Sequence, residues 1–362
     1  MAERVLLCNA GSSSLKLLGT DLAREKSEEI LFSGSQDEIF AAFESFLTSH
    51  QRPDIVLHRI VHAGSVSEAP EKIDSELRAR IKHWQPLAPL HNTLALALID
   101  AIDKQWPDSQ QLAIFDSGLF SQLPPHSRRY ALADNVSPQW PVQRYGFHGL
   151  AHRSQMRALQ SQGSFQRVIT LQLGGGSSAA AWLGGVVLDT SMGFTPMEGL
   201  PMGSRSGSID PGIVLHLISN ENMSLESVQE LLNDKSGLKA LSGGVADMRE
   251  LLASEAKSAR FAVEYYCYHL RKLIGSYIAI LGGIDAVTIG GGIGENQAEI
   301  RNLLLQNLEH LCIEFDESAN VAANGLSALQ KPGSTTQVWL TPVDEADEML
   351  RQYKHYMHLH RL

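Results

Sequence analysis

Residues 5–16 read VLLCNAGSSSLK, a short apolar strand that runs directly into a turn of glycine and serine and ends at a lysine. The same design returns at 168–182, VITLQLGGGSSAAAW, and at 286–296, AVTIGGGIGEN. Residues without a bulky Cβ let successive backbone N–H groups converge on phosphate oxygens, and serine hydroxyls add further donors. One such turn is as typical of an ordinary strand exit as of a phosphate site. Three of them in one chain predict a protein that binds a nucleotide or a polyphosphate.

The lysine that ends the first stretch, Lys16, can supply the mobile positive charge that a polyphosphate needs nearby. No GxxxxGK[ST] string occurs in the chain, which excludes a P-loop NTPase, and the protein-kinase signature set is absent as well. We therefore expect a fold that holds phosphate in the turns of β-hairpins.

Composition favours a folded protein whose partners are small molecules. The chain has 362 residues, 43% of them hydrophobic and 19% charged, which suits two domains of ordinary size. Its net charge of −10 and its lack of a polybasic stretch argue against nucleic acid or an anionic membrane as partners. The most apolar window, 274–293, is interrupted by glycines and an aspartate and is too broken to span a membrane. With three scattered cysteines and no signal-peptide pattern, a cytoplasmic protein is expected.

The order of predicted elements suggests an α/β protein with an internal duplication. The elements are a hairpin about the turn at 11–14, a helix at 37–50, a strand from 55, a helix at 93–104, a strand at 111–116, a second hairpin at 167–190, a loop at 191–210, helices at 213–220, 224–233 and 250–281, a strand from 286, a helix at 297–311, a strand at 337–343 and a closing helix from 344. We expect two α/β domains with a cleft between them, at 1–150 and 151–343, with the helix at 344–362 completing the first domain.

Polar side chains are concentrated where the apolar strands end. Arg59 and His62 follow IVL, Asp116 follows LAIF, His148 lies in RYGFHG, and Arg205 lies in MGSRSGSID. Each of them taken alone is more often a structural residue. Together they are typical of phosphoryl transfer, which needs positive donors, a metal ion and precise alignment. The two arginines can clamp phosphate or carboxylate, and the imidazole can donate a hydrogen bond to the moving phosphoryl group.

These residues belong to longer motifs that resemble the acetate kinase family, within the larger superfamily of actin, sugar kinases and Hsp70-like proteins. Over nearly the whole length the chain carries NAGSSSLK, HRIVHAG, PLAPLHN, FDSGLF, RYGFHG, DTSMGFTPMEGLPMGSRSGSIDPG, KSGL, LSGG, DMRE and GGIGEN. The resemblance implies duplicated ribonuclease H-like domains with an interdomain cleft. It also implies a transferase that passes a phosphoryl group in line and reversibly from ATP to acetate, giving acetyl phosphate and ADP. Mg²⁺ or Mn²⁺ is the implied metal, and a homodimer is the implied assembly.

Carried over position by position, the resemblance assigns a role to each polar group. Arg59 would bind the carboxylate or acyl phosphate, Asp116 would be the catalytic carboxylate that orients substrate or metal, and His148 and Arg205 would stabilise the transition state. Residues around the alkyl end of the substrate would be Val61, Leu90, His91, Phe147 and Pro196, although the apolar ones suit a plain core equally well.

The resemblance also implies where the metal and the nucleotide bind. Asn9 and Glu345 would help to hold the metal ion. The nucleotide would be bound by Lys16, Gln172, Leu173, Gly174, Gly175, Gly176, Asp247, Met248, Arg249, Gly292, Ile293, Gly294, Glu295 and Asn296. An ordinary pair at the start of a helix is the alternative for Asp247 and Arg249.

Several positions depart from the family pattern and keep alternatives open. Gln172 stands where the family usually has histidine, and Gly175 where it usually has asparagine, so the second turn keeps fewer side-chain donors. Ala63, Thr93 and the stretch TPVDEAD near the metal position also differ. The alternatives are pyrophosphate as donor, propionate or butyrate as acceptor, and a non-catalytic nucleotide-dependent switch. The acceptor stays open because one methylene is worth only about 1–3 kcal/mol in an apolar pocket.

Overall fold

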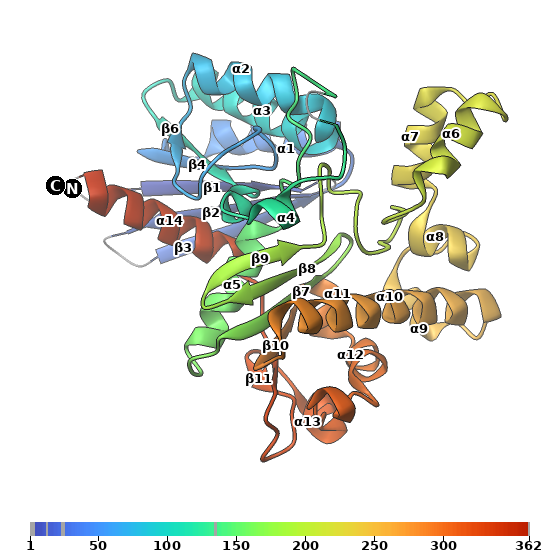
Figure 1. The fold of residues 1–362 in the computed structure, drawn as a ribbon. Coiled ribbons are helices and arrows are strands. Elements are labelled where there is room, and N and C mark those ends of the chain that lie inside the picture. Colours follow the sequence, from blue (N-terminus) through green and yellow to red (C-terminus); the bar gives the residue numbers. More distant parts are fainter. Residues whose placement is uncertain (1–3, 12–13, 23–25, 134–135, 361–362) are drawn as a thin grey trace. The chain divides into compact units, whose positions relative to one another are not determined.

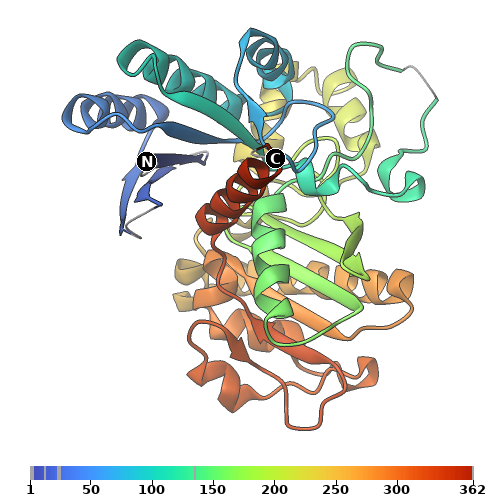
Figure 2. The same cartoon turned by 90° about the vertical axis from the view of Figure 1, so that its left-hand side faces the viewer.

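The computed structural model describes residues 4–11, 14–22, 26–133 and 136–360 of the chain (Figures 1 and 2). It divides into two compact units: Met1–Ser121 with Asp344–Leu362 form unit 1, and Gln122–Val343 form unit 2. The first division falls at Ser121, ahead of the boundary expected at residue 150. The chain between these two positions is part of unit 2, where Ser127 Oγ donates a hydrogen bond to the carbonyl of Leu188.

Unit 1 is built on a mixed sheet with the strand order β3-β2-β1-β4-β6-β5. Its strands are β1 (Arg4–Ala10), β2 (Ser14–Asp21), β3 (Lys26–Ser33), β4 (Ile55–Ile60), β5 (Glu71–Lys72) and β6 (Gln110–Phe115). The first three strands pair antiparallel, whereas β4 runs parallel to both β1 and β6. The predicted hairpin is therefore confirmed, although residues 12 and 13 of its turn lie outside the described residues.

The helices of unit 1 cover this sheet with their apolar faces. They are α1 (Gln36–Ser49), α2 (Ser75–Trp84), α3 (Pro89–Gln105) and α14 (Glu345–His360), with 3₁₀ turns at Gln85–Leu87 and Gly118–Phe120. A capping box between Ser35 and Glu38 starts α1, and its buried face presents Phe43 and Phe46 to the core. At the far end of the sequence α14, red in Figure 1, packs against β1.

Unit 2 repeats the sheet of unit 1 strand for strand. The strands β7 (Arg167–Leu173), β8 (Ser177–Leu183), β9 (Val186–Thr190), β10 (Ala286–Gly290), β11 (Ser327–Ala328) and β12 (Gln337–Leu340) lie in the order β9-β8-β7-β10-β12-β11. The pairs β7–β8 and β8–β9 are antiparallel, β7–β10 and β10–β12 are parallel, and β11–β12 is antiparallel. Each pairing has its counterpart in unit 1, which is the result expected from a duplicated domain.

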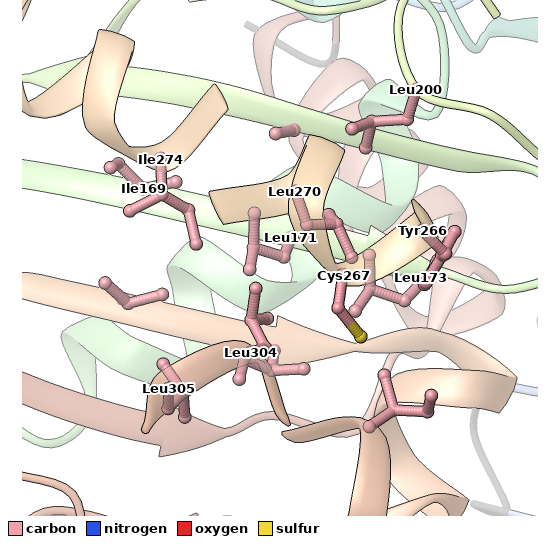
Figure 3. Close-up of a cluster of buried hydrophobic side chains, with 14 of the residues drawn as sticks. Ile169, Leu171, Leu173, Leu200, Tyr266, Cys267, Leu270, Ile274, Leu304 and Leu305 are labelled. Carbon is pink, nitrogen blue, oxygen red and sulfur yellow. The ribbon is translucent and has the colours of Figure 1, made fainter. Parts of the chain in front are cut away.

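The helices of unit 2 are α4 (Pro125–Arg128), α5 (Gly149–Gln160), α6 (Pro211–Ser219), α7 (Leu225–Asp234), α8 (Gly237–Ser242), α9 (Met248–Ala253), α10 (Lys257–Leu281), α11 (Gly291–Asn296), α12 (Ala298–Leu305) and α13 (Glu317–Ala322), with a 3₁₀ turn at Glu309–Leu311. Of these, α5 packs on β7 and β10, and α10 packs on β7 and β8. Figure 3 shows the core where Leu270 and Ile274 of α10 meet Ile169 and Leu171 of β7. Among the described residues, no helix is both long and apolar enough to cross a bilayer.

Several element boundaries differ from the sequence predictions, among them that of the helix expected over 297–311, because α12 ends at Leu305. The single helix expected over 250–281 is wrong, because the chain is extended at Ser254 and at Ala256, and Ser254 Oγ accepts a hydrogen bond from Ala256 N between α9 and α10. The third glycine stretch is not a hairpin turn, since residues 291–296 form α11. The last strand stops at Leu340, two residues before Pro342, which has no N–H for a ladder.

Candidate active site

Four of the predicted site residues meet at one edge of the unit 1 sheet. Asn9 lies near the end of β1, Arg59 near the end of β4, Asp116 directly after β6, and Glu345 is the first residue of α14. Ligands collect at the carboxyl ends of parallel strands in open α/β sheets. The fold therefore brings together side chains that are up to 336 positions apart in sequence.

Arg59 is the centre of this cluster, which we call the Arg59 cluster (Asn9, Arg59, Asp116 and Glu345). Its Nε and Nη2 donate to the two carboxylate oxygens of Asp116 at 3.3 and 3.1 Å. Its Nη1 donates to Asn9 Oδ1 at 3.3 Å and lies 3.7 Å from Glu345 Oε2. Asn9 Nδ2 closes the ring with a 2.7 Å bond to Glu345 Oε2. One edge of the guanidinium is thus committed to Asp116, and the other is held more loosely.

The electrostatics of the cluster follow from its burial. The Asp116 side chain is 0% exposed and that of Arg59 only 10%. Burial by itself lowers the pKa of Arg59, but the carboxylates of Asp116 and Glu345 outweigh burial and raise this pKa above its ordinary value. The single positive charge of Arg59 faces the two negative charges of Asp116 and Glu345. The excess negative charge would attract a further cation.

The oxygen atoms of this cluster suit a magnesium ion. Carboxylate and amide oxygens are the ligands of hard divalent cations, and Mg²⁺ commonly binds through one or two carboxylates while keeping waters and taking phosphate oxygens. Nowhere in the described parts of the chain do three or more histidine, cysteine, aspartate or glutamate side chains gather as a metal site. The two carboxylates and the Asn9 amide therefore match a shared magnesium site, and not an all-protein cage.

Lys16 lies beside the cluster but has its own partner. It pairs with Asn9 in the β1–β2 register, and its Nζ is 3.0 Å from Glu29 Oε2. Both side chains are more than a third exposed. Ion pairs of this kind contribute about 0–1 kcal/mol, so Lys16 can exchange Glu29 for a phosphate at little cost.

Unit 2 contains a cavity of about 580 Å³, within the usual range for ligand pockets. We call it the glycine-lined cavity, and it is lined by Gly174, Gly175, Gly203, Ala246, Asp247, Met248, Arg249, Gly292, Ile293, Asn296 and Gln297. Eight of these were predicted to bind nucleotide, whereas Gly203, Ala246 and Gln297 were missed. Gly203 lies in the MGSRSG motif, which the sequence analysis used only for Arg205.

Other predicted nucleotide residues lie behind the cavity wall. Leu173 is fully buried in the core. Gln172 pairs with Gly290 in the sheet, its side chain lies against Gly291, and its buried Oε1 has no hydrogen-bond partner among the described residues. Glu295 Oε1 accepts hydrogen bonds from the N–H groups of Gly291 and Val343 at 2.9 and 3.1 Å. These side chains support the backbone that lines the cavity.

A buried arginine that the sequence analysis missed holds the same backbone. Arg301 of α12 is 2% exposed, and its Nη1 donates to the carbonyls of Gly294 and Glu295 at 2.8 and 2.9 Å. Its Nε and Nη2 bond to Asn320 at 2.6 and 2.9 Å. Burial lowers the pKa of Arg301. Only its position in the apolar run AEIRNLLL distinguishes it from a surface arginine.

The loop that carries Arg205 is tied to the glycine turn of β7 and β8. Gly203 N donates to Gly175 O at 3.4 Å, and Lys239 N donates to Gly203 O at 2.9 Å. Arg205 Nη1 donates to Pro196 O at 3.4 Å, and within the described chain its guanidinium makes no ion pair with a carboxylate. Burial lowers the pKa of Arg205. A half-buried guanidinium with unused donors is suited to bind an anion.

His148 lies against the same glycine turn. It has a left-handed backbone, with φ +60°, directly before α5. A Cβ built on Gly176 would lie 3.1 Å from Cε1 of the imidazole, so a side chain at that position would displace the ring. Unit 2 therefore gathers His148, the turn at 174–176, the Arg205 loop and α11.

Asp247 and Arg249 form a helix-start pair and also line the cavity. Asp247 caps α9 by accepting from Arg249 N at 2.8 Å, and Arg249 Nη2 bonds to its other carboxylate oxygen at 2.6 Å. These hydrogen bonds from Arg249 lower the pKa of Asp247 to about 2. The pair is preformed as an ionised carboxylate and a well-exposed cation.

The residues predicted around the alkyl end of the substrate are mostly buried. Val61 is 4% exposed in unit 1, and Phe147 is 1% exposed in unit 2. His91, which follows Leu90 at the start of α3, and Pro196 are half-buried. The side chain of Leu90 lies outside the described residues. The assignment of these residues to the substrate stays a prediction.

The sequence and the fold of this chain are similar to those of known proteins. A model described as the Acetokinase family matches residues 44–351. The acetate kinase of Syntrophobacter fumaroxidans is 36% identical over 394 aligned residues, which cover 96% of this chain and 96% of that protein. The crystal structure of Porphyromonas gingivalis acetate kinase matches with a TM-score of 0.86 at 32% identity, covering 98% of this chain and 100% of that one. A propionate kinase from Francisella tularensis matches with a TM-score of 0.86 at 27% identity, covering 97% and 98%.

Proposed function

This chain belongs to the acetokinase family, and from that premise we propose that it transfers a phosphoryl group reversibly from ATP to acetate, giving acetyl phosphate and ADP. The observation that carries the proposal is the Arg59 cluster, in which a buried guanidinium faces two carboxylates beside a further amide oxygen. An enzyme that joins phosphate to a carboxylate needs such a group to hold planar oxygen pairs. A pure binder of nucleotide does not.

Arg59 would bind acetate through its Nη1 edge. Its Nε and Nη2 are committed to Asp116, whereas Nη1 lies 3.3 and 3.7 Å from its present oxygen partners. Asp116 fixes the orientation of the guanidinium, so that the acetate carboxylate meets a preorganised donor. Such preorganisation matters because transfer in line requires the attacking oxygen to be aligned before the reaction.

The nucleotide would occupy the glycine-lined cavity of unit 2. Gly174 and Gly175 line one wall, where the N–H of Gly174 already donates to Gly176 O at 3.0 Å, and Gly292 and Ile293 form part of another. Arg205 and the imidazole of His148 would donate to the phosphoryl oxygens as charge develops in the transition state. Asn9 and Glu345 would hold Mg²⁺ or Mn²⁺, which when bound would neutralise charge on the phosphates of the nucleotide.

Hydroxylamine trapping of the acyl phosphate tests this function. Acetate, propionate and butyrate are each supplied with ATP or with pyrophosphate, in the presence of Mg²⁺. A signal with acetate and ATP is the expected result. A protein that binds nucleotide but yields no acyl phosphate with any pair would overturn the kinase proposal and favour a nucleotide-dependent switch.

A second acceptor is favoured by one specific observation, the match to a propionate kinase at the same TM-score as to an acetate kinase. Pyrophosphate stays open as an alternative donor because Gln172 and Gly175 leave the second turn with fewer side-chain donors than is usual in the family. The ratio of kcat/KM for acetate to kcat/KM for propionate decides which acceptor is preferred. The ratio of kcat/KM for ATP to kcat/KM for pyrophosphate decides which donor is preferred.

We also propose that the enzyme acts as a homodimer on small molecules in the cytoplasm. The resemblance to the family supports the dimer, and the acidic net charge supports small molecules as partners. Light scattering coupled to size exclusion measures the assembly directly. A monomer that retains full activity at the same concentration would contradict the dimer.

A further inference from the structure

A continuous chain of hydrogen bonds runs behind His148 through the interior of unit 2. His148 Nδ1 lies 2.9 Å from Ser178 Oγ, which lies 2.8 Å from His152 Nε2. His152 Nδ1 lies 2.8 Å from Thr170 Oγ1, and Trp182 Nε1 donates to the same oxygen at 2.9 Å. The four supporting residues, Trp182, Thr170, His152 and Ser178, are each 0% exposed. Unlike the glycine turns, none of them was singled out from the sequence.

The indole at the far end of this chain sets the direction of its protons. An indole N–H can only donate, so Thr170 Oγ1 must accept from Trp182. In the described structure the hydroxyl proton of Thr170 has one acceptor within reach, His152 Nδ1. With Nδ1 accepting, the neutral ring of His152 carries its proton on Nε2 and donates it to Ser178.

The same direction continues to His148. Because Ser178 Oγ accepts from His152, its own proton is directed to His148 Nδ1, and the neutral imidazole of His148 then carries its proton on Nε2. The opposite direction would leave the hydroxyl proton of Thr170 buried without an acceptor, which is unfavourable in a dry interior. A single tautomer of His148 follows.

The protonated nitrogen of His148 is the one that faces the glycine turn. A Cβ built on Gly176 would lie 3.2 Å from His148 Nε2, which places this nitrogen beside the turn at 174–176. The hydrogen bond to Ser178 also holds the ring of a residue whose positive φ is uncommon outside glycine. Orientation and tautomer are therefore fixed by the same contact.

We propose that Trp182, Thr170, His152 and Ser178 are positioning residues that hold His148 as the Nε2–H tautomer, with this nitrogen facing the glycine turn, where it would donate a hydrogen bond to a bound phosphoryl oxygen. The catalytic meaning of this relay rests on the proposed kinase function. The tautomer itself is a property of the protein alone and can be measured without substrate.

The test is long-range ¹H–¹⁵N NMR on full-length protein labelled with ¹⁵N-histidine. The signals of the two rings are assigned by their loss in the His148→Gln and His152→Gln variants. We expect unprotonated Nδ1 and protonated Nε2 at His148 in the unaltered protein. Thr170→Val removes the hydroxyl at constant shape and is expected to give a mixture of tautomers, whereas Thr170→Ser keeps the hydroxyl and serves as the matched control.

Turnover gives the second measurement. Thr170→Val is expected to lower kcat about 10-fold with little change in KM for either substrate, and Thr170→Ser to restore it. Trp182→Phe, which removes the N–H and keeps a ring, replaces Thr170→Val if the valine variant does not fold. A His148 with Nδ1 protonated in the unaltered protein, or a tautomer unchanged in both Thr170→Val and Trp182→Phe, would overturn the relay. Absence of acyl phosphate formation in the unaltered protein would instead count against the kinase function and leave the tautomer measurement standing.

Discussion

At the scale of single residues, the buried Arg59–Asp116 pair is the group on which turnover depends most directly. Arg59→Lys keeps the charge but loses the fork that engages both carboxylate oxygens of Asp116. We expect kcat/KM for acetate to fall about 100-fold, as when a preorganised donor to the reacting group is removed. Steady-state acyl phosphate formation measures the loss.

The matched control for this change is Arg351→Lys on α14, where the arginine is half-exposed and pairs with Asp347. That variant is expected to keep full activity, since an exposed ion pair contributes about 0–1 kcal/mol. Arg59→Ala is the harsher variant, because it leaves the Asp116 carboxylate buried without its partner, at a cost of about 3–5 kcal/mol. An Arg59→Lys protein with normal kcat/KM would remove Arg59 from the proposed site.

His58, next to Arg59 in β4, makes the stability of unit 1 depend on pH. It is fully buried, its Nε2 lies 2.7 Å from Gln111 Oε1, and burial lowers its pKa from 6.5 to about 4. Because the folded pKa lies below the unfolded one, the unfolded state takes up the additional proton first. The free energy of unfolding therefore falls as the pH drops from 6.5 towards 4, by up to about 3 kcal/mol.

Thermal unfolding between pH 4 and 8 measures this dependence. His58→Leu removes the titrating group and is expected to flatten the curve below pH 6.5, at the cost of the hydrogen bond to Gln111. The exposed His310, substituted in the same way, controls for the general loss of a histidine. Identical curves for His58→Leu and the unaltered protein would contradict the assignment.

At the scale of elements, the loop before α8 depends on a close backbone approach at Gly237. A Cβ there would lie 2.1 Å from Met202 O and 2.6 Å from Arg205 O, and φ is +60°. Gly237→Ala is therefore expected to displace the Arg205 loop, lowering both the melting temperature and kcat. Gly243, which ends α8 with φ +84° and has no atom within 4 Å of its Cβ, is the control.

The two alanine variants separate backbone strain from steric displacement. Gly243→Ala carries the strain of a left-handed backbone, about 1–2 kcal/mol, and should lower the melting temperature while sparing kcat. Gly237→Ala carries the same strain together with the clash against the Arg205 loop. Equal kcat values in the two variants would show that the close approach does not position Arg205.

The segment formed by β10 and α11 could be predicted only in part from the sequence. The strand AVTIG and its glycine exit were identified because apolar runs that end in glycine are strong local patterns. The six residues after the strand were expected as a turn, and they form a helix because Glu295 and Arg301 satisfy backbone groups at its two ends. Such contacts join side chains to backbone groups that local propensity does not place. Asp116, by contrast, was found because the end of a buried strand is a local feature.

Arg301 is predicted to support the backbone of α11. Arg301→Met leaves the carbonyls of Gly294, Glu295 and Asn320 without their donors, each at a cost of about 1–3 kcal/mol. We expect a lower melting temperature and weaker ADP binding by calorimetry. Arg260→Met, at an exposed position on α10, is the control for the loss of an arginine, and equal ADP affinity in the two variants would contradict a supporting role for Arg301.

At the scale of the whole molecule, the duplicated sheets explain why site residues are spread along the sequence. In each unit the antiparallel hairpin, the two parallel strands and the short edge strand recur in the same order. The hairpin turn of β7 and β8 is the counterpart of the turn after β1. The duplication was suggested by the sequence through its glycine turns, whereas the matching edge strands, β5 and β11, have only two residues each and carry no periodic pattern.

After unit 2 the chain returns to unit 1, where α14 is its last helix. Met349 and Tyr353 of α14 are 0% exposed, and the helix packs on β1 and begins with Glu345 of the Arg59 cluster. Burying two such side chains contributes about 3–6 kcal/mol, so deleting residues 344–362 is expected to unfold or strongly destabilise unit 1. Unit 2 has its own core and its own cavity, and it should still bind ADP.

Hydrogen exchange read by mass spectrometry distinguishes the two units after this deletion. Peptides from β1, β4 and β6 are expected to lose protection, while ADP should still protect peptides that contain 174–176 and 292–297. Deleting only residues 358–362, where the described side chains are exposed, is the control and should leave both patterns unchanged. Loss of ADP protection together with that of β1 would show that the units do not fold independently. Retained protection of β1 would show that unit 1 folds without α14.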